Sequence, residues 1–242
     1  MNKAIKTELA PNGVLRAAIN LSNFLLVSGK LPDGTPDGIS PDIAKQVAAR
    51  IGVPYQLITY ERPGLVADAA DRNEWDIGNI AAEAERAEII DFSNPYVVID
   101  ANFLTQKTSS FKCNSDVNSA GVRIAVSERS AYDLWLTKNF KNAELVRANS
   151  IQDSHDMFLR GDVDVVASLK PKLLEEIESN AELNMIEIPF TSVNQSIGVK
   201  KNSPNAIAFL NDLIEELVEN DFINISLKKH GVDQKLSIPK SN

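Results

Sequence analysis

Cysteine is nearly absent from this chain, which has Cys113 as its single cysteine among 242 residues. One cysteine excludes an internal disulfide and says little about the compartment in which the protein works. Histidine is scarce too, and neither His155 nor His230 lies near Cys113 in the sequence. We therefore expect no reactive role for Cys113. Both histidines fit structural or solvated positions, His155 within a predicted helix and His230 at the end of another.

Positive charge is also in deficit, with 25 Lys and Arg against 33 Asp and Glu and a formal net charge of −8. A chain of this charge is poorly suited to the phosphates of nucleic acids or to anionic lipid. Long apolar runs are missing as well, since none approaches the roughly 18–20 residues that a membrane-spanning helix needs. We expect no nucleic-acid partner and no membrane insertion.

Motifs for catalysis and for cofactors are a third absence. The chain has no G-x-G-x-x-G, no Gly-Lys-Ser/Thr phosphate loop, no H-E-x-x-H and no Ser-His-Asp signature. Nucleotide and metal chemistry are therefore unsupported, and we predict no cofactor, no metal site and no catalytic residue. The first residues, MNKAIKTELAPNG, also lack the apolar segment of a secretory signal. Either a signal has been removed or the protein stays in the cytoplasm.

What is present describes a soluble protein with a core, because 43% of the residues are hydrophobic and 24% are charged. The length allows one large domain or two lobes of roughly 100–150 residues each. In a first run, strands alternate with helices over Val14–Asn20, Ser40–Ile51, Tyr55–Tyr60, Gly64–Arg72 and Trp75–Ile80. Ser40 is the expected N-cap of the earlier helix and Pro41 its first helical residue.

A longer strand, Tyr96–Gln106, and a polar stretch, Lys107–Gly121, separate this run from a second one. The second run covers Val122–Ser127, Ala131–Asn139, Glu144–Arg147, Ser150–Leu159, Val163–Ala167 and Pro171–Glu178, followed by short strands at Asn184–Ile188 and Gln195–Val199. Two more helices are expected at Asn205–Glu219 and Phe222–His230, with a frayed tail after Gly231.

Strands that alternate with helices in two successive runs indicate an α/β protein whose sheets are mostly parallel and flanked by helices. We predict two lobes, residues 1–106 plus 195–242 and residues 107–194, joined by crossover segments near 105–108 and 190–195. A cleft between the lobes is the expected ligand site, and two crossovers suit hinge closure around a ligand.

One arginine stands out in the stretch Trp75–Tyr96, which reads WDIGNIAAEAERAEIIDFSNPY. Arg86 lies in a short acidic helix predicted over Ala82–Ile90, just beyond the carboxyl end of a strand, where open α/β sheets bind ligands. The surrounding glutamates suit the start of a helix and need no functional explanation. Arg86 either contacts a ligand or forms an intrahelical ion pair with Glu83 or Glu85, and its position leaves both interpretations open.

Four local patterns between about Leu15 and His230 resemble the periplasmic solute-binding proteins of ABC importers, in the group that includes the polar amino-acid binders. The patterns are LRAAIN, GISPDIAKQVAARIGV, the stretch around Arg86, and GVRIAVSERSAYDLWL followed by GDVDVV. The third is the most specific, because the family commonly ends it R-x-x-x-x-D-F-S-x-P-Y. NLSNFLLV and RSAYDLWL are similar to a divergent subgroup. The resemblance implies a type II two-lobe fold that binds a small solute.

Arg86 matches the arginine that holds the solute's carboxylate in this family. A guanidinium donates through a rigid two-pronged fork, so it can hold a carboxylate bidentately where a lysine cannot. The residue five before it, usually Ser or Thr, is Ala81 here, which keeps the backbone N–H and loses the hydroxyl. Asn79 matches the position whose backbone carbonyl usually accepts from the solute's amino group.

In the second lobe, Arg129, Ser130 and Ala131 match a Gly-Thr-Thr-like turn, which the family places at a helix N-terminus over the carboxylate. Ser130 can be a plain N-cap or part of an anion site, and the two are compatible. The sharpest departure is Leu169, because binders of ordinary α-amino acids have an aspartate there for the ammonium group.

Two further positions differ from the family. Arg62 replaces an aromatic residue usual near the start of the second helix, and Asn23 stands where an early tyrosine is usual. One anionic anchor is thus missing, while Arg62 and Arg129 are candidate cations of the pocket, with a solvated surface position as the alternative for each. The charge balance predicts a small anionic or zwitterionic solute with at least one carboxylate, and not necessarily an ammonium.

The resemblance favours a monomeric binding protein, not an enzyme, that delivers its solute to an ABC permease in the periplasm if the chain is a mature form. An enzyme that catalyses eliminations on small carboxylic acids, as cyclohexadienyl dehydratase does, is the alternative on the same fold. Glu61 and Glu128 are conceivable acids for it, although nothing in the sequence indicates a raised pKa. A cytoplasmic sensor or ligand buffer is the third interpretation, if Met1 is the native start.

Overall fold

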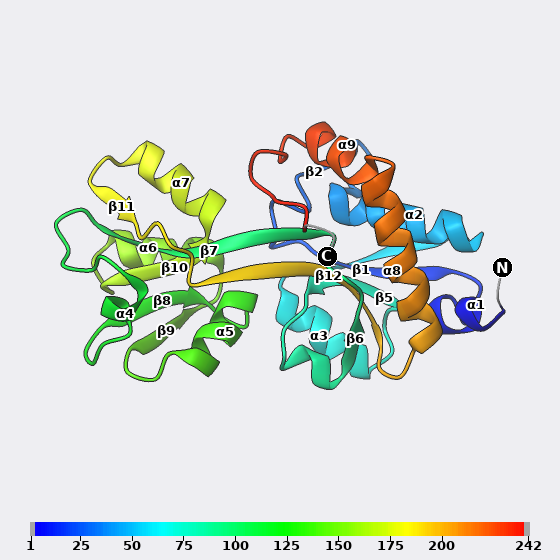
Figure 1. Cartoon of the computed structure of the whole chain (residues 1–242), viewed down its shortest axis with the longest axis horizontal. Helices are drawn as coiled ribbons and strands as arrows, with labels where there is room; N and C mark the ends of the chain where they lie inside the picture. Colours follow the sequence, from blue (N-terminus) through cyan, green and yellow to red (C-terminus); the bar gives the residue numbers. More distant parts are fainter. Residues whose placement is uncertain (1–2, 240–242) are drawn as a thin grey trace. The chain divides into compact units, whose positions relative to one another are not determined.

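A computed structural model describes residues 3–239 of the chain (Figure 1). The described residues form two compact units: unit 1 runs up to Val98 and resumes at Asn194, and unit 2 comprises Ile99–Val193. The chain passes from one unit to the other in two long strands, β7 (Val97–Gln106) and β12 (Thr191–Lys200). No helix between residues 3 and 239 is both long and apolar enough to cross a membrane.

Unit 1 contains a sheet in which three neighbouring strands are parallel and the strand beside them is antiparallel. In sheet order they are β4 (Tyr55–Tyr60), β1 (Leu15–Asn20), β5 (Ile77–Ala81) and β12, with β6 (Ile90–Phe92) also paired to β12. β1 pairs in parallel with β4 and β5, whereas β12 runs antiparallel to β5 and β6. The carboxyl ends of β4, β1 and β5 therefore lie at one edge of the sheet.

Helices cover both faces of this sheet, namely α1 (Lys3–Leu9), α2 (Ile39–Ile51), α3 (Pro63–Asp71), α8 (Pro204–Glu219) and α9 (Phe222–Lys229). Figure 1 shows α2 and α9 on one side of β1 and β5 and α3 on the other. Under α3 the core contains Val66, Trp75 and Ile80, and the Trp75 indole N–H donates to the Val66 carbonyl at 2.9 Å. Strands buried on both faces need the apolar runs that the sequence has there.

The predicted N-cap of α2 is wrong. The helix starts at Ile39 after Gly38, and Ser40 lies inside its first turn. Gly38 has a φ of 153°, and a Cβ there would overlap the Leu26 carbonyl oxygen, so the position requires glycine. Ser40 is buried, and its hydroxyl lies 3.2 Å from the Tyr96 hydroxyl. The serine therefore makes a hydrogen bond in the core instead of capping the helix.

The acidic helix predicted over Ala82–Ile90 is also wrong. Arg86–Glu88 forms a short 3-10 helix, η1, and Ile90 already belongs to β6. Pairing with β12 decides this outcome, because β6 joins that strand and the Ala82 N–H donates to the Asn194 carbonyl at 2.9 Å. A sheet contact distant in the sequence thus overrides local helical propensity.

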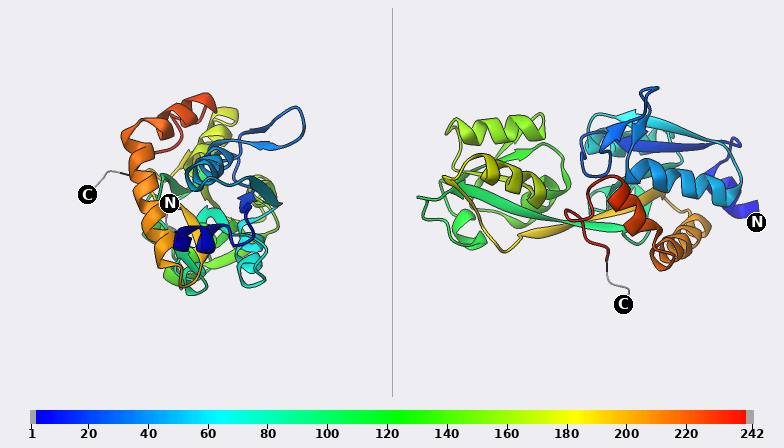
Figure 2. Two further views of the ribbon diagram at one scale, coloured as in Figure 1. Left: turned by 90° about the vertical axis from the view of Figure 1, so that its right-hand side faces the viewer. Right: turned by 90° about the horizontal axis from the view of Figure 1, so that it is seen from above.

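Both ends of the described chain pack onto unit 1. The sequence pattern did not predict α1, which lies beside α8 (Figure 2) and whose Glu8 carboxylate accepts from the Ala206 N–H at 2.7 Å. This carboxylate satisfies a backbone donor in the first turn of α8. The predicted fraying after Gly231 is wrong as far as Ser237, because Ser237 and Val98 exchange backbone hydrogen bonds of 2.7 and 3.1 Å. The end of that predicted tail, residues 240–242, lies outside the described part.

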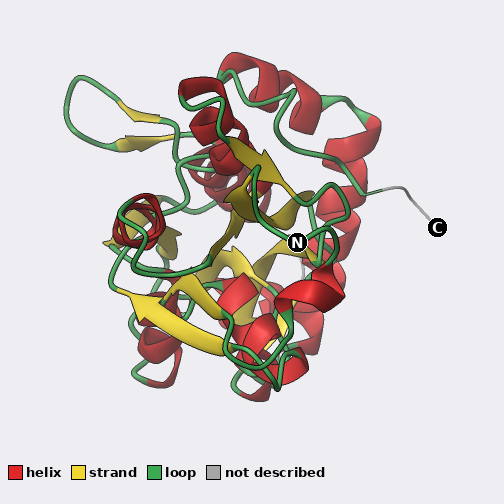
Figure 3. Cartoon of the chain, turned by 90° about the vertical axis from the view of Figure 1, so that its left-hand side faces the viewer, coloured by secondary structure: helices red, strands yellow, loops and turns green. Residues whose placement is uncertain are grey.

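A two-stranded hairpin of β2 (Gly29–Lys30) and β3 (Pro36–Asp37) projects from unit 1 (Figure 3). Its connection contains Asp33, whose side chain accepts from the Thr35 N–H at 2.9 Å. That hydrogen bond lowers the pKa of Asp33. The turn agrees with the density of Pro, Asp and Gly in this segment.

A partly buried ion pair joins the start of β1 to the residue before β5. The Asp76 side chain is 3% exposed, and its carboxylate accepts from the Arg16 backbone N–H at 2.8 Å and from Arg16 Nη2 at 2.7 Å. Arg16 Nη1 donates to the Asn73 carbonyl at 2.8 Å. The hydrogen bond with Asp76 raises the pKa of Arg16. The pair aligns two neighbouring strands of unit 1.

Unit 2 has a similar plan, with β7, β10 (Val165–Leu169), β8 (Arg123–Ser127) and β9 (Glu144–Ala148) in sheet order, and β11 (Leu183–Met185) also paired to β7. β8 pairs in parallel with β9 and β10, and β7 runs antiparallel to β10 and β11. The helices are α4 (Asn114–Val117), α5 (Ala131–Asn139), α6 (Ile151–Leu159) and α7 (Lys170–Ser179). Phe158, Val166 and Leu173 lie in its core.

His155 is a buried residue of α6, with Nδ1 3.3 Å from the Glu176 carboxylate of α7. Burial lowers the pKa of His155 to about 4, although the charge of Glu176 opposes this shift. The imidazole is therefore neutral near pH 7 and packs as part of the unit 2 core.

Candidate ligand-binding site

In unit 1, the residues expected at the site follow the carboxyl ends of neighbouring parallel strands. Asn23 follows β1, Arg62 follows β4, and Arg86 follows β5, whose last residue is Ala81. Because β4, β1 and β5 are adjacent in the sheet, these segments begin at the same edge. Ligands of open α/β sheets bind at such an edge.

Arg86 is the most deeply buried cation at this edge. The residue is 3% exposed, and its Nη1 donates to the Ala81 carbonyl at 2.9 Å. This hydrogen bond folds the side chain back toward the end of β5. A buried guanidinium is costly unless it is hydrogen-bonded and has a counter-charge, so the fold keeps Arg86 here at a cost.

Glu83 is a candidate site residue that was not predicted from the sequence, where it resembles an ordinary acid at the start of a helix. Its side chain is half-buried, and burial raises the pKa of Glu83 to about 7, with the charge of Arg86 opposing the shift. Glu83 and Arg86 thus interact electrostatically, while the intrahelical ion pair itself stays a prediction. The ligand interpretation of Arg86 stays a prediction. The signal in the sequence was the spacing of three residues between the two charges.

Asn79 lies in the centre of the unit 1 sheet, paired with Ile19 of β1 and Ile197 of β12. It is 1% exposed, and among residues 3–239 neither its Nδ2 nor its Oδ1 has a hydrogen-bond partner. An unpaired buried amide costs on the order of 1–3 kcal/mol. The family resemblance implies a role for Asn79 through its backbone carbonyl, whereas the unusual feature of the structure is its side chain.

Asn23 has a local role in the backbone, and Arg62 lies at the start of a helix. The Asn23 side-chain oxygen accepts from the Leu25 N–H at 3.3 Å, and the Asn23 carbonyl accepts from the Val27 N–H at 2.9 Å. Asn23 therefore shapes the turn after β1. Arg62 is the half-buried residue before Pro63, at the N-cap position of α3. Their predicted contacts with a solute stay predictions.

In unit 2, the carboxyl ends of β8 and β10 also meet at one edge, because these strands are parallel neighbours. Ser130 follows β8 and is the N-cap of α5, where its Oγ accepts from the Asp133 N–H at 3.1 Å. The plain N-cap interpretation is therefore right. Ala131 is the first residue of α5 and is buried, and Leu169, the last residue of β10, is 5% exposed. The edge thus places Ser130, Ala131 and Leu169 at neighbouring strand ends.

Arg129 has a strained backbone for an arginine. Its φ is 54°, while the other non-glycine residues with positive φ in the described chain are Asn or Asp. The left-handed region costs roughly 1–2 kcal/mol for ordinary residues. The turn is held by Asp133, a 2% exposed residue whose carboxylate accepts from the Arg129 N–H at 2.7 Å and from Arg147 Nε at 3.1 Å.

We expect Arg129→Gly to stabilise the protein by about 1 kcal/mol, because glycine adopts positive φ without the steric penalty. The measurement is chemical denaturation followed by circular dichroism. Arg129→Ala is the matched control, since it removes the same side chain and keeps the strain. Equal stabilities of the two variants would contradict the backbone explanation.

Two buried hydroxyl groups lie close to the N-terminus of α5. Burial raises the pKa of Tyr132 to about 12, and the nearby hydroxyls of Ser130, Ser168 and Ser127 oppose this shift. Within the part of the chain that the structure describes, neither the Tyr132 hydroxyl nor Ser168 Oγ completes a hydrogen bond. The edge of unit 2 is therefore lined with hydroxyls, and no pattern in the sequence indicated this cluster.

Comparison with known families identifies the chain. A family model described as bacterial extracellular solute-binding proteins, family 3, matches residues 27–232. The chain belongs to this family. Among curated protein sequences, no relative matches this family 3 protein significantly.

Solved structures resemble this family 3 protein over nearly its whole length. AbpA from Streptococcus pneumoniae, bound to L-arginine, is 20% identical with a TM-score of 0.75, covering 96% of this chain and 99% of its own. Holo ArgBP from T. maritima is 22% identical with a TM-score of 0.69, covering 87% and 92%. The ancestral amino acid-binding protein AncCDT-1, a precursor of cyclohexadienyl dehydratase, is 19% identical with a TM-score of 0.72, covering 92% and 97%.

These likenesses confirm the predicted α/β two-lobe fold of the type II periplasmic binding proteins. They also confirm the resemblance that the stretch around Arg86 indicated. Because the identities are near 20%, these similarities show the fold of this solute-binding protein and do not identify its solute.

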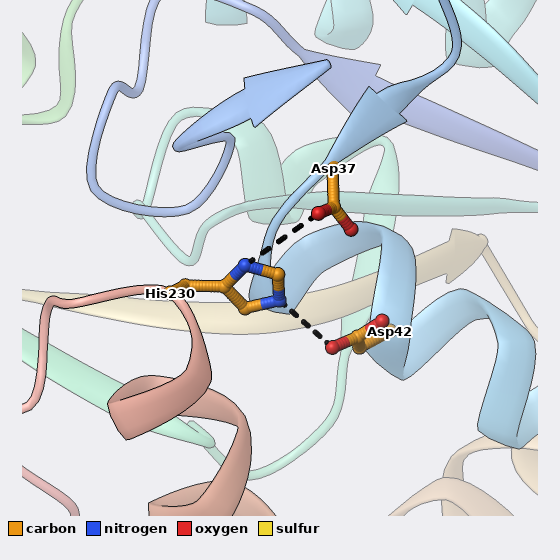
Figure 4. Close-up of side chains that lie close together, drawn as sticks. All are labelled: Asp37, Asp42 and His230. Atoms are coloured by element: carbon orange, nitrogen blue, oxygen red, sulfur yellow. Dashed lines mark hydrogen bonds and ion pairs between the residues drawn. The ribbon is translucent and has the colours of Figure 1, made fainter. Parts of the chain in front are cut away.

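The described side chains best placed to hold a metal ion are Asp37, Asp42 and His230, whose nearest ligand atoms lie within 4.8 Å of one another. Figure 4 shows the imidazole between the two carboxylates, with Nε2 2.9 Å from Asp42 and Nδ1 3.9 Å from Asp37. Opposite ring nitrogens thus face different carboxylates, and the Lys229 ammonium lies 3.2 Å from Asp42. This geometry is that of an ion cluster tying α9 to α2, because a metal would compete with the ammonium for the same oxygens.

The cluster surrounds the Asp42 carboxylate with hydrogen-bond donors, and this carboxylate also accepts from the Ser226 hydroxyl at 2.9 Å. Burial alone would raise the pKa of Asp42, but the hydrogen bonds that its carboxylate accepts outweigh burial and hold the pKa below its usual value. The stabilisation from this shift is present above the unfolded pKa and is lost as the pH falls below it.

Proposed function

We propose that this family 3 protein binds a small carboxylate-bearing solute, anionic or zwitterionic, with Arg86 as the anchor of the carboxylate. The observation that carries the proposal is the burial of the Arg86 guanidinium at the carboxyl edge of β5. A guanidinium is kept in such a place when a planar anion needs two parallel hydrogen bonds.

A small number of hydrogen bonds is enough for micromolar affinity toward the solute. A hydrogen bond to a charged group contributes on the order of 1.5–3 kcal/mol, and micromolar binding needs about −8 kcal/mol. Three or four such contacts together with apolar burial suffice. We propose Arg86, the Ala81 N–H and the start of α5 at Ser130 and Ala131 as the carboxylate contacts, and Asn79, Asn23, Arg62 and Arg129 as contacts of the remaining solute.

The chemical class of the solute follows from Leu169 and the hydroxyl cluster near it. A buried leucine offers no partner to an ammonium group, whereas the hydroxyls of Tyr132 and Ser168 offer donors to oxygen. We therefore favour an organic acid or an amino-acid derivative with a further oxygen function. AbpA is bound to L-arginine, so cationic amino acids belong in any test panel.

The setting that this family implies is delivery of the solute to an ABC permease outside the cytoplasmic membrane. We propose this setting and a monomeric protein, with the permease as its protein partner. A cytoplasmic sensor of the same fold would bind the same class of solute, so fractionation of cells that produce the natural gene separates the two.

Native mass spectrometry of the freshly purified protein, followed by a thermal-shift screen, tests the proposed function. The screen contains mono- and dicarboxylates, the common amino acids and neutral sugars. We expect a co-purified acid or a rise in melting temperature with carboxylates. Binding restricted to neutral or cationic sugars would overturn the proposal.

A second candidate, an enzyme for eliminations on small carboxylic acids, is favoured by one observation. Glu83 has a pKa of about 7 and lies beside Arg86, and a carboxyl group with a pKa near the working pH suits general acid or base catalysis. Proton NMR of the same carboxylates incubated with the protein would detect new vinyl signals, which binding alone does not produce.

A further inference from the structure

Glu83 and Arg86 belong to one turn of backbone directly after β5. The Ala87 N–H donates to the Glu83 carbonyl at 2.9 Å, which makes residues 83–87 a single helical turn. Side chains three residues apart on such a turn lie on the same side. The charge of Arg86 acts on the half-buried carboxyl of Glu83, so this carboxyl lies within electrostatic reach of the buried guanidinium that we propose as the carboxylate anchor.

Several other charged residues of the described chain lie on or near this turn. Glu85 and Glu88 are exposed on it. Lys201, from the segment after β12, donates to the Ala87 carbonyl at 2.6 Å and pairs with Asp91 of β6 at 2.9 Å. The charge that acts on the Glu83 carboxyl is that of Arg86. Exposed charges are screened by solvent, whereas this pair is not.

We propose that Glu83 is the exchangeable counter-ion of Arg86, which neutralises the guanidinium in the absence of solute and takes up a proton when the solute's carboxylate replaces it. The inference rests on the proposed function and adds a residue and a coupled proton to that site. The proton comes from solvent and binds a carboxylate oxygen of Glu83. No covalent bond of the solute changes.

The physical reason is repulsion between two carboxylates that share one guanidinium in a partly buried place. Without solute, burial already raises the pKa of Glu83 to about 7 despite the pull of Arg86. A second carboxylate on Arg86 raises it further, because like charges disfavour ionisation. At pH values between the pKa of Glu83 in the free protein and its higher pKa in the complex, the complex binds more protons than the free protein. Affinity for a carboxylate therefore falls as the pH rises above about 7, by up to tenfold per pH unit, and is flat below it.

Isothermal titration calorimetry at pH 8 in two buffers of different ionisation enthalpy, phosphate and Tris, measures the proton uptake. The probes are succinate, L-glutamate, L-glutamine and L-arginine. For the probes that bind the natural protein, we expect an uptake that approaches one proton per solute and an affinity that is higher at pH 6.5 than at pH 8.5. Glu83→Gln should bind with no uptake and little pH dependence, because the amide is permanently neutral.

Glu88→Gln is the matched control, since it removes an exposed carboxylate from the same turn and should leave the uptake unchanged. Binding of a probe without proton uptake, or equal uptake by Glu83→Gln and the natural protein, overturns this inference and leaves the proposed function standing. Failure of all four probes together with the carboxylates of the thermal-shift screen overturns the proposed function, and the inference with it.

Discussion

Replacing Arg86 by alanine is expected to abolish solute binding, with an affinity loss of at least about 100-fold. Two charge-assisted hydrogen bonds from the guanidinium contribute about 3–6 kcal/mol together, and each 1.4 kcal/mol is a factor of ten. The measurement is calorimetric titration with the solutes that bind the natural protein. Arg86→Lys keeps the charge and loses the two-pronged geometry, so it should bind only weakly.

The melting temperature of Arg86→Ala is expected to stay within a few degrees of that of the natural protein. Removal of the guanidinium leaves the Ala81 carbonyl without one hydrogen bond and Glu83 without its counter-charge. Glu83 then becomes protonated and neutral, which limits the electrostatic cost. A loss of many degrees, with binding kept in the folded fraction, would assign Arg86 to structure instead.

Replacing Asp76 by alanine is expected to lower the free energy of unfolding by about 3 kcal/mol, at the low end of the effect of breaking a buried ion pair, because the Arg16 side chain is 20% exposed. The Asp76 carboxylate is buried and accepts hydrogen bonds from both the backbone and the side chain of Arg16. Its removal leaves a guanidinium without its charge partner between β1 and β5. Calorimetry should record a fall of roughly 10 °C in melting temperature.

Arg72→Ala is the matched control for this prediction. Arg72 pairs with Glu74 close by in the sequence, but the side chains are 56% and 40% exposed, and exposed pairs contribute little. We therefore expect no measurable change in the melting temperature. Similar effects of Arg72→Ala and Asp76→Ala would mean that burial does not decide the strength of these pairs.

Local patterns in the sequence predicted most of the elements of this protein. α5 has the predicted bounds, Ala131–Asn139, because Ser130 is an N-cap whose signal lies within three residues of it. The central strands β1, β5, β8 and β10 were recognisable because buried strands need apolar residues. The predictions failed where distant segments decide the outcome: pairing with β12 converts the acidic helix into η1 and β6, and a contact with Tyr96 moves Ser40 into the core.

The sequence by itself determined the alternation of strands and helices, the family, and the place of Arg86 just beyond a strand. These properties depend on residues that are neighbours along the chain. Only the tertiary structure decided that Arg86 is buried and that Glu83 beside it has a pKa near 7. Burial removes water from a charged group, and that loss depends on atoms contributed by segments far apart in the sequence. No local pattern of charges records it.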